Sequence, residues 1–85
     1  FYHTHQQNEE IYIFLKGTGE FQIDGKIFPV REGSIVRVDP AGERCYRNCG
    51  DTDLYLIVIQ VKAGSYEGRT IQDGVAVRKR VSWEQ

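Results

Sequence analysis

Short apolar runs with a period of two recur along the chain, and glycine, proline and aspartate residues separate them. Residues 11–15 are β-branched or aromatic, which favours a strand, and glycines follow at positions 17 and 19. Phe21 and Ile23 then alternate with polar residues up to Asp24-Gly25, a dipeptide typical of a two-residue hairpin turn. The first third of the chain therefore predicts a strand followed by a β-hairpin.

The rest of the chain continues this pattern of short strands and turn residues. Pro29 indicates a strand end or a sheet edge, because proline cannot donate a hydrogen bond within a sheet. Residues 63–74 have little periodicity, and Trp83 near the end is interpreted as a packing anchor. Eight candidate strands, counting the short segment around His3 and His5, and no amphipathic helix predict an all-β sandwich or barrel. The later strands are expected over residues 27–30, 35–38, 44–48, 54–61 and 75–81.

Two of the expected strands, residues 11–15 and 54–61, are apolar on both faces. A sheet with one face in water usually alternates apolar and polar residues, so these strands predict a covering layer on each side. A second copy of the chain is the favoured cover, which predicts a homodimer. The alternative is that residues 63–74 fold back over the sheet.

Composition and charge fit one small soluble domain. The 85 residues are enough for one modest core, and 40% of them are apolar. A net charge of -1 gives no reason to expect nucleic acid or an anionic membrane as a partner. No apolar run is long enough for a membrane helix, and no signal peptide is visible. Two cysteines, Cys45 and Cys49, are too few for a disulfide framework, so we expect reduced thiols and a cytoplasmic location.

Two histidines and two glutamates near the start of the chain are candidate metal ligands. His3 and His5 are two residues apart, and in a strand such residues point to the same face, roughly 6.6 Å apart along it. Two imidazoles can then converge on one ion, and Glu9 or Glu10 can supply a carboxylate. Imidazole and carboxylate suit zinc, iron, manganese or nickel better than calcium or magnesium. The alternative is two surface histidines that merely lie near two glutamates.

Two sequence segments resemble the motifs of the cupin superfamily. The first reads His-x-His from His3, then four residues, Glu10, six residues and Gly17. The second contains Pro40-Ala41-Gly42 and Asn48-Cys49-Gly50-Asp51. The resemblance implies a double-stranded β-helix, the cupin-type jelly-roll barrel, as a single domain over residues 1–85. Cupins are commonly dimers, which agrees with the homodimer expected above.

The resemblance also implies roles for the candidate ligands. In the first cupin motif the two histidines and the glutamate bind a metal, which corresponds to His3, His5 and Glu10 here. Glu9 is an alternative ligand, but the distance to Gly17 favours Glu10. The expected cofactor is a divalent transition metal: zinc, iron, manganese or nickel.

The second motif departs from the cupin pattern at the fourth ligand. Cupins carry a histidine between the Pro-x-Gly and the Asn, and this chain has no histidine after His5. Counting forward from Pro40 places that position at Cys45, whereas counting back from Asn48 places it at Arg44. As a thiolate, Cys45 is a candidate fourth ligand; its alternative role is that of a small buried apolar residue. Arg44 in this place would repel a cation and favour an anionic ligand.

The same parity argument predicts a pocket. If Glu10 points into the barrel, Tyr12 and Phe14 do so too, and together with Arg44 they would line a site for a small-molecule ligand. Three functions follow: a metal-dependent enzyme, a binding or sensing module with or without metal, and a dimerisation domain whose site has decayed. The sequence favours a metal-binding cupin whose activity stays unassigned, since the fold does not choose a reaction.

Cupins usually have one or two strands before the first histidine, and this chain has only Phe1 and Tyr2 there. Two explanations stay open. Either these aromatic residues hold the histidine segment by packing, or a missing segment supports it.

Overall fold

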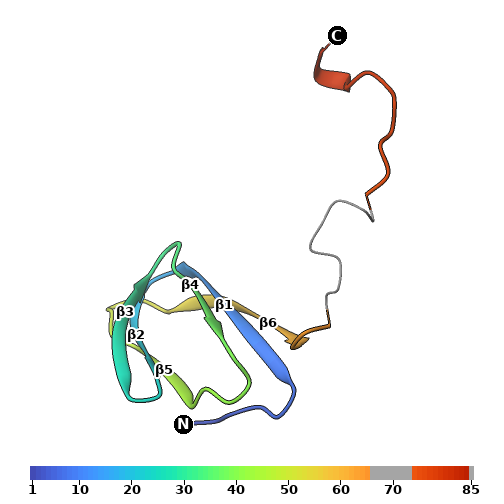
Figure 1. Cartoon of the computed structure of the whole chain (residues 1–85). Helices are drawn as coiled ribbons and strands as arrows, with labels where there is room; N and C mark the ends of the chain where they lie inside the picture. The colour runs from blue at the N-terminus through green and yellow to red at the C-terminus, as the bar shows by residue number, and fades with distance from the viewer. Residues whose placement is uncertain (66–73, 85) are drawn as a thin grey trace.

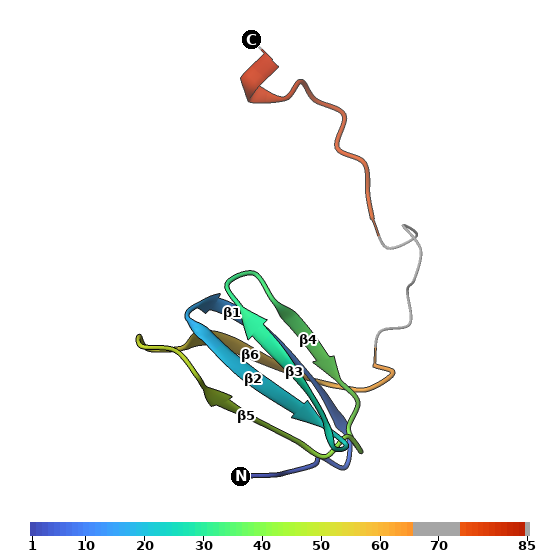
Figure 2. The ribbon, with the colours of Figure 1, turned by 90° about the vertical axis from the view of Figure 1, so that its left-hand side faces the viewer.

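The computed structural model describes residues 1–65 and 74–84 and contains two facing antiparallel sheets of three strands each (Figures 1 and 2). One sheet has the order β4-β1-β6 and the other the order β3-β2-β5. The strands are β1 (Asn8–Lys16), β2 (Thr18–Ile23), β3 (Lys26–Arg31), β4 (Ile35–Val38), β5 (Arg44–Asn48) and β6 (Tyr55–Lys62). This arrangement confirms the predicted all-β jelly roll.

The hairpin between β2 and β3 forms at the predicted turn. Asp24 and Gly25 have φ angles of 49° and 86°, and Ile23 pairs with Lys26 across them. Positive φ at both central residues matches the twist of the flanking strands, and this explains why the dipeptide sets the register.

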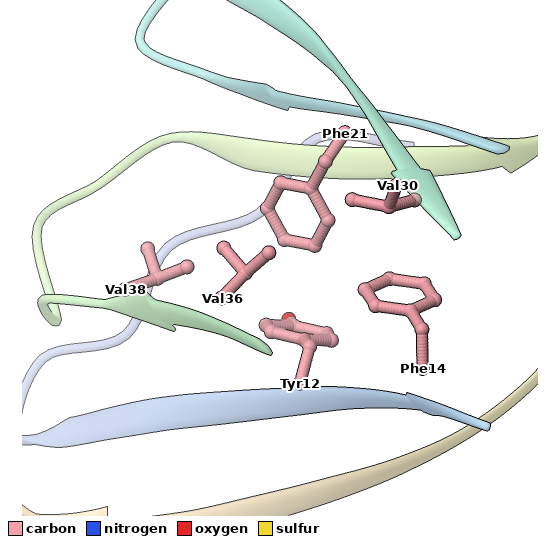
Figure 3. Packing of buried hydrophobic residues seen from close by; sticks show 6 residues of the cluster. All are labelled: Tyr12, Phe14, Phe21, Val30, Val36 and Val38. Carbon is pink, nitrogen blue, oxygen red and sulfur yellow. The ribbon is translucent and has the colours of Figure 1, made fainter. Parts of the chain in front are cut away.

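The core lies between the two sheets and contains inward-pointing residues of β1, β2, β3 and β4 (Figure 3). The Tyr12 ring packs edge-on against Phe21 of the facing sheet at 4.8 Å between centroids. The Phe14 ring also packs edge-on against Phe21, at 6.3 Å between centroids. Valines of β3 and β4 fill the remaining space: Val30, Val36 and Val38.

The opposite side of the β4-β1-β6 sheet is also apolar but remains exposed. Ile35, Ile13 and Ile57 stand in one cross-strand row, and Ile35 is 68% exposed. We call this surface the outer apolar face; its members are Ile13, Leu15, Ile35, Ile57, Ile59 and Val61. The prediction that β1 and β6 are apolar on both faces is therefore confirmed.

The end of the chain differs from the prediction. Within the described part of the chain, residues 75–81 form no strand, and a 3-10 helix, η2 (Ser82–Glu84), follows them. Trp83 is 87% exposed rather than a packing anchor of this chain. Both differences have the same cause, because residues 74–84 lie away from the two sheets (Figure 1). The proposed fold-back of residues 63–74 falls largely outside the described residues. The described residues contain no helix long and apolar enough to cross a membrane.

Candidate metal centre

Backbone hydrogen bonds to the second motif place the two histidines. The His3 amide donates to the Arg44 carbonyl at 3.1 Å, and the Arg44 amide donates back to His3 at 3.1 Å. The His5 amide donates to the Pro40 carbonyl at 2.8 Å. Phe1 is fully exposed, so these bonds, rather than packing of Phe1, hold the segment against the barrel.

Glu10 contacts both imidazoles from the inner face of β1, where its side chain is 4% exposed. Its Oε1 lies 3.3 Å from His3 Nε2 and 3.1 Å from His5 Nε2. One donor atom from each of the three residues lies within 4.8 Å of the others. Nitrogen and oxygen ligands sit about 2.0–2.2 Å from a transition metal, so two of them on one ion are about 3 Å apart. The spacing of these atoms fits a shared ion.

His5 supplies a further test of that fit. Within the described residues, its Nε2 is a buried polar atom that forms no hydrogen bond. The nearby Glu10 oxygen is within ion-pair distance, but the two atoms do not form a hydrogen bond. A buried polar atom without a partner is costly, and a metal ion would remove that cost. The histidines and the glutamate therefore fit a divalent transition ion.

Arg44 occupies the remaining side of Glu10. Its guanidinium is fully buried, and its Nη1 donates to Glu10 Oε1 at 2.6 Å. The other donors are committed to backbone carbonyls of the preceding loop: Nη2 to Asp39 at 2.7 Å and Pro40 at 2.9 Å, and Nε to Gly42 at 2.9 Å. Four of the five N–H groups of a guanidinium are thus used, so Arg44 is a fixed structural partner of Glu10.

Tyr12 also contacts this carboxylate, because its hydroxyl donates to Glu10 Oε1 at 2.7 Å. Burial acts to raise the pKa of Glu10, but hydrogen bonds from Tyr12, Arg44 and His3, together with the charge of His5, hold it below its ordinary value. Burial, with the hydrogen bond to the ionised Glu10 next, raises the pKa of Tyr12. Glu10 is therefore ionised and Tyr12 neutral at pH 7, which suits a carboxylate ligand.

The structure separates the remaining predicted site residues. Of the two positions left open for the fourth ligand, it places Arg44 beside Glu10, whereas Cys45 follows on the opposite side of β5 and pairs with Gln22. Tyr12 and Phe14 do point inward, but they are almost fully buried in the core. They pack the barrel instead of lining an open pocket, so Tyr12 reaches the site only through its hydroxyl.

The sequence did not predict the ion pair between Glu10 and Arg44. The available signal was motif spacing, because counting back from Asn48 places the fourth-ligand position at Arg44, the buried residue of β5. Glu9 points to the other face of β1 and pairs with Arg37 at 2.8 Å. The choice of Glu10 over Glu9 agrees with this geometry.

Comparison with known proteins identifies the family. The family model described as the cupin domain matches residues 2–60. The chain belongs to the cupin superfamily. Cupins often bind metals, and the cluster of His3, His5 and Glu10 is a group that could hold one.

Three similar proteins were found among curated proteins and solved structures. An oxalate-binding protein of Thermotoga maritima is 33% identical over 57 residues, covering 67% of this chain and 47% of that protein. The crystal structure of a cupin protein from Bacteroides fragilis matches with a TM-score of 0.83 at 44% identity, covering 91% of this chain and 65% of that one. A predicted oxalate decarboxylase from Thermotoga maritima matches with a TM-score of 0.71 at 31% identity, covering 73% and 54%. The chain thus spans about half the length of the curated relatives it matches.

Proposed function

We propose that this cupin binds one divalent transition metal ion, such as zinc, iron, manganese or nickel, through His3, His5 and Glu10. The convergence of the two Nε2 atoms on Glu10 Oε1, at 3.3 and 3.1 Å, is the observation that carries the proposal. Three protein ligands leave coordination positions for a ligand or substrate. When bound, such an ion would supply Lewis-acid chemistry, or redox chemistry if it is iron or manganese.

The protein residues around the ion would have separate roles. Glu10 supplies the negative charge, and Tyr12 and Arg44 fix its orientation by donating to the same oxygen. The two imidazoles are partly exposed, with His3 and His5 at 35% and 25% side-chain exposure. A ligand would therefore approach from the histidine side, because Arg44 and the aromatic core close the opposite side.

The ligand that we propose to test first is oxalate, a small dicarboxylate. The support is the printed description of two similar proteins, an oxalate-binding protein and a predicted oxalate decarboxylase. Two carboxylates can chelate one ion at its open positions. We assign no reaction to the chain. We also propose a cytoplasmic location, because Cys45 and Cys49 are free thiols.

A second candidate is a small-molecule binding or sensing cupin without a functional metal. The favouring observation is that Glu10 Oε1 already accepts hydrogen bonds from Arg44 and Tyr12. A buried ion pair of this kind neutralises Glu10 without any metal, and the guanidinium would repel a cation.

Thermal unfolding with and without metal separates the two candidates. The metal-binding account predicts that zinc, iron, manganese or nickel raises the unfolding temperature, since a ligand at 100 times its Kd adds ~2.7 kcal/mol to stability. Glu10→Gln should abolish the rise, whereas Glu9→Gln, one residue along on the opposite face, should retain it. No stabilisation by any of the four ions would favour the metal-free account. Calorimetry with oxalate, with and without metal, then tests the ligand.

A further inference from the structure

A second hollow lies on the β3-β2-β5 sheet, at the end where β2 begins and β3 ends. Its volume is about 430 Å³, within the range of roughly 300–1,000 Å³ that is typical of small-molecule sites. The metal centre lies toward the other end of this sheet, because Arg44 pairs with Ile23, five residues or roughly 16 Å along β2 from Thr18. The hollow is therefore a separate feature of the barrel. It is lined by Thr18, Gly19, Pro29, Val30, Arg31 and Ser34.

Strand pairing and the following turn bring three hydrogen-bond donors to this hollow. Thr18 stands directly opposite Arg31 in the register of β2 and β3, and such pairs have Cβ atoms about 4.5–5.5 Å apart. Both side chains point outward, because the next residues in their strands, Gly19 and Val30, are buried. The turn after β3 adds Ser34, whose hydroxyl oxygen accepts a hydrogen bond from the Arg31 amide at 2.9 Å and keeps its own proton to donate. One guanidinium and two hydroxyls thus share one site.

The hollow carries a positive charge. Arg31 is exposed, and its guanidinium forms no ion pair within residues 1–65 and 74–84. The six lining residues include no acidic side chain, and Glu32, the next residue in the turn, is not one of them. The site therefore favours an anion. The other strand arginines are each paired with a glutamate: Arg37 with Glu9, Arg44 with Glu10 and Arg47 with Glu20.

The number of donors indicates which anion fits. A guanidinium binds a carboxylate or a phosphate through two parallel hydrogen bonds. These two bonds occupy both oxygens of a carboxylate, whereas a phosphate monoester has a third terminal oxygen for the hydroxyls of Thr18 and Ser34. Pro29, which is exposed in the wall of the hollow, offers a carbon surface to the esterified group. The lining therefore matches a phosphate monoester better than a simple carboxylate.

We propose that this hollow binds the phosphate group of a small phosphate monoester. Arg31 holds two phosphate oxygens, Thr18 and Ser34 donate to the third, and the carbon skeleton of the ester packs on Pro29. The proposal does not depend on the metal centre, which lies toward the opposite end of the sheet.

Titration of the intact, isotope-labelled chain with glycerol phosphate tests the site. Bound metal is first removed with a chelating resin, so that the anion cannot bind to an ion. The proposal predicts saturable binding with a Kd of about 1 mM or lower, and NMR shifts that are largest at the amides of Thr18, Arg31 and Ser34. Acetate, titrated in the same way, should bind more weakly. No saturation at ~10 mM glycerol phosphate overturns the proposal, and so do shifts confined to the segment of His3 and His5.

Variants at the hollow separate a built site from general attraction of anions. Arg31→Gln should raise the Kd for glycerol phosphate by ~10-fold or more, and Arg31→Lys, which keeps the charge but not the fork, should recover only part of this loss. Thr18→Val should raise the Kd by ~3-fold or more, because it removes one hydroxyl at constant shape.

The matched control is Lys26→Gln, which changes the net charge by the same amount at the other end of β3. Lys26 is five residues from Arg31, roughly 16 Å along the strand, and the Debye length at physiological salt is only ~8 Å, so the Kd should stay within about twofold. Far-UV circular dichroism checks that each variant keeps its sheets. Equal losses in Arg31→Gln and Lys26→Gln, or unchanged binding by Arg31→Gln, would overturn the proposal.

Discussion

Replacing Arg44 with methionine should weaken the metal-free fold and strengthen metal binding, and these opposite signs make it a sharp test of the site. Arg44→Met keeps a long apolar side chain and removes the guanidinium that donates to Glu10 at 2.6 Å. Glu10 remains 3% exposed and loses its cationic partner. The same change leaves three loop carbonyls without the donors that Arg44 gave them.

The expected magnitude follows from the burial of the pair. Breaking a buried ion pair by removing one partner costs ~3–5 kcal/mol, because the other charge stays buried and uncompensated. An 85-residue domain has a total stability of roughly 4–13 kcal/mol. The variant should therefore be close to unfolding in the presence of a chelator, with a melting temperature at least ~12 °C lower.

Metal binding should change in the other direction. The guanidinium would lie within ~5 Å of an ion bound to Glu10, and at that distance the repulsion is worth several kcal/mol even at an effective dielectric constant of ~20. Its removal also leaves Glu10 free for the ion. We expect Arg44→Met to bind metal at least ~10-fold more tightly than the unmodified chain, which corresponds to ~1.4 kcal/mol.

The assay is urea unfolding in a chelator and again in excess zinc or manganese, with metal titrations by calorimetry. The matched control is Arg47→Met, on the opposite side of β5, where an exposed guanidinium pairs with Glu20. Surface ion pairs contribute little, so the control should stay close to the unmodified chain in both conditions. Equal stability of the two variants in chelator, or weaker metal binding by Arg44→Met, would refute the reasoning.

Three further predictions test the carboxylate and the core. Tyr12→Phe should cost ~1.5–3 kcal/mol in urea unfolding, because it removes a hydrogen bond to a charged group but retains the ring; a neutral result would show that the hydroxyl does not support Glu10. The folded-state pKa of Glu10 is below its ordinary value of 4.5, so the stability that its ionised form contributes should be complete above pH 4.5 and be lost as the pH falls through the folded-state pKa. Between pH 7 and pH 3, the free energy of unfolding should fall less steeply for Glu10→Gln than for the unmodified chain. Identical slopes for the two proteins would contradict this. Phe14→Ala should cost ~3–5 kcal/mol by the same measurement, since the ring is fully buried between the sheets, and a loss below ~1 kcal/mol would place the ring outside the core.

Period-two alternation and turn residues predicted the all-β class, and the resemblance to cupins predicted the jelly roll. Strand positions such as Tyr12 and Phe21 are buried where the alternation predicts, and Asp24-Gly25 sets the hairpin as expected. These signals are local, because each depends on the backbone preference and the alternation of neighbouring residues. The strand predicted at 75–81 does not form in the described part of the chain, where these residues lie away from the two sheets. Local alternation does not specify whether a sheet edge lies within reach of a segment.

The candidate ligands could be predicted from spacing and resemblance, but their electrostatic environment could not. Nothing near Glu10 in sequence indicates that Arg44, 34 residues later, donates to it. That contact forms because β1 and β5 face each other across the barrel, and because the carbonyls of the preceding loop hold the Arg44 guanidinium in place. Parity predicted correctly that Tyr12 and Phe14 point inward, but the two rings pack in the core and do not line the open pocket that the sequence predicted.

The metal content of the purified chain tests the central claim most directly. Elemental analysis, without added metal, should be made on the unmodified chain, on His5→Ala and on Glu9→Gln as the control. We predict about one zinc, iron, manganese or nickel ion per chain, kept in the control and lost in His5→Ala, because His5 Nε2 is a buried donor atom within 3.1 Å of Glu10. No bound ion, and none taken up on incubation with these four metals, would contradict the account and leave a metal-free binding barrel.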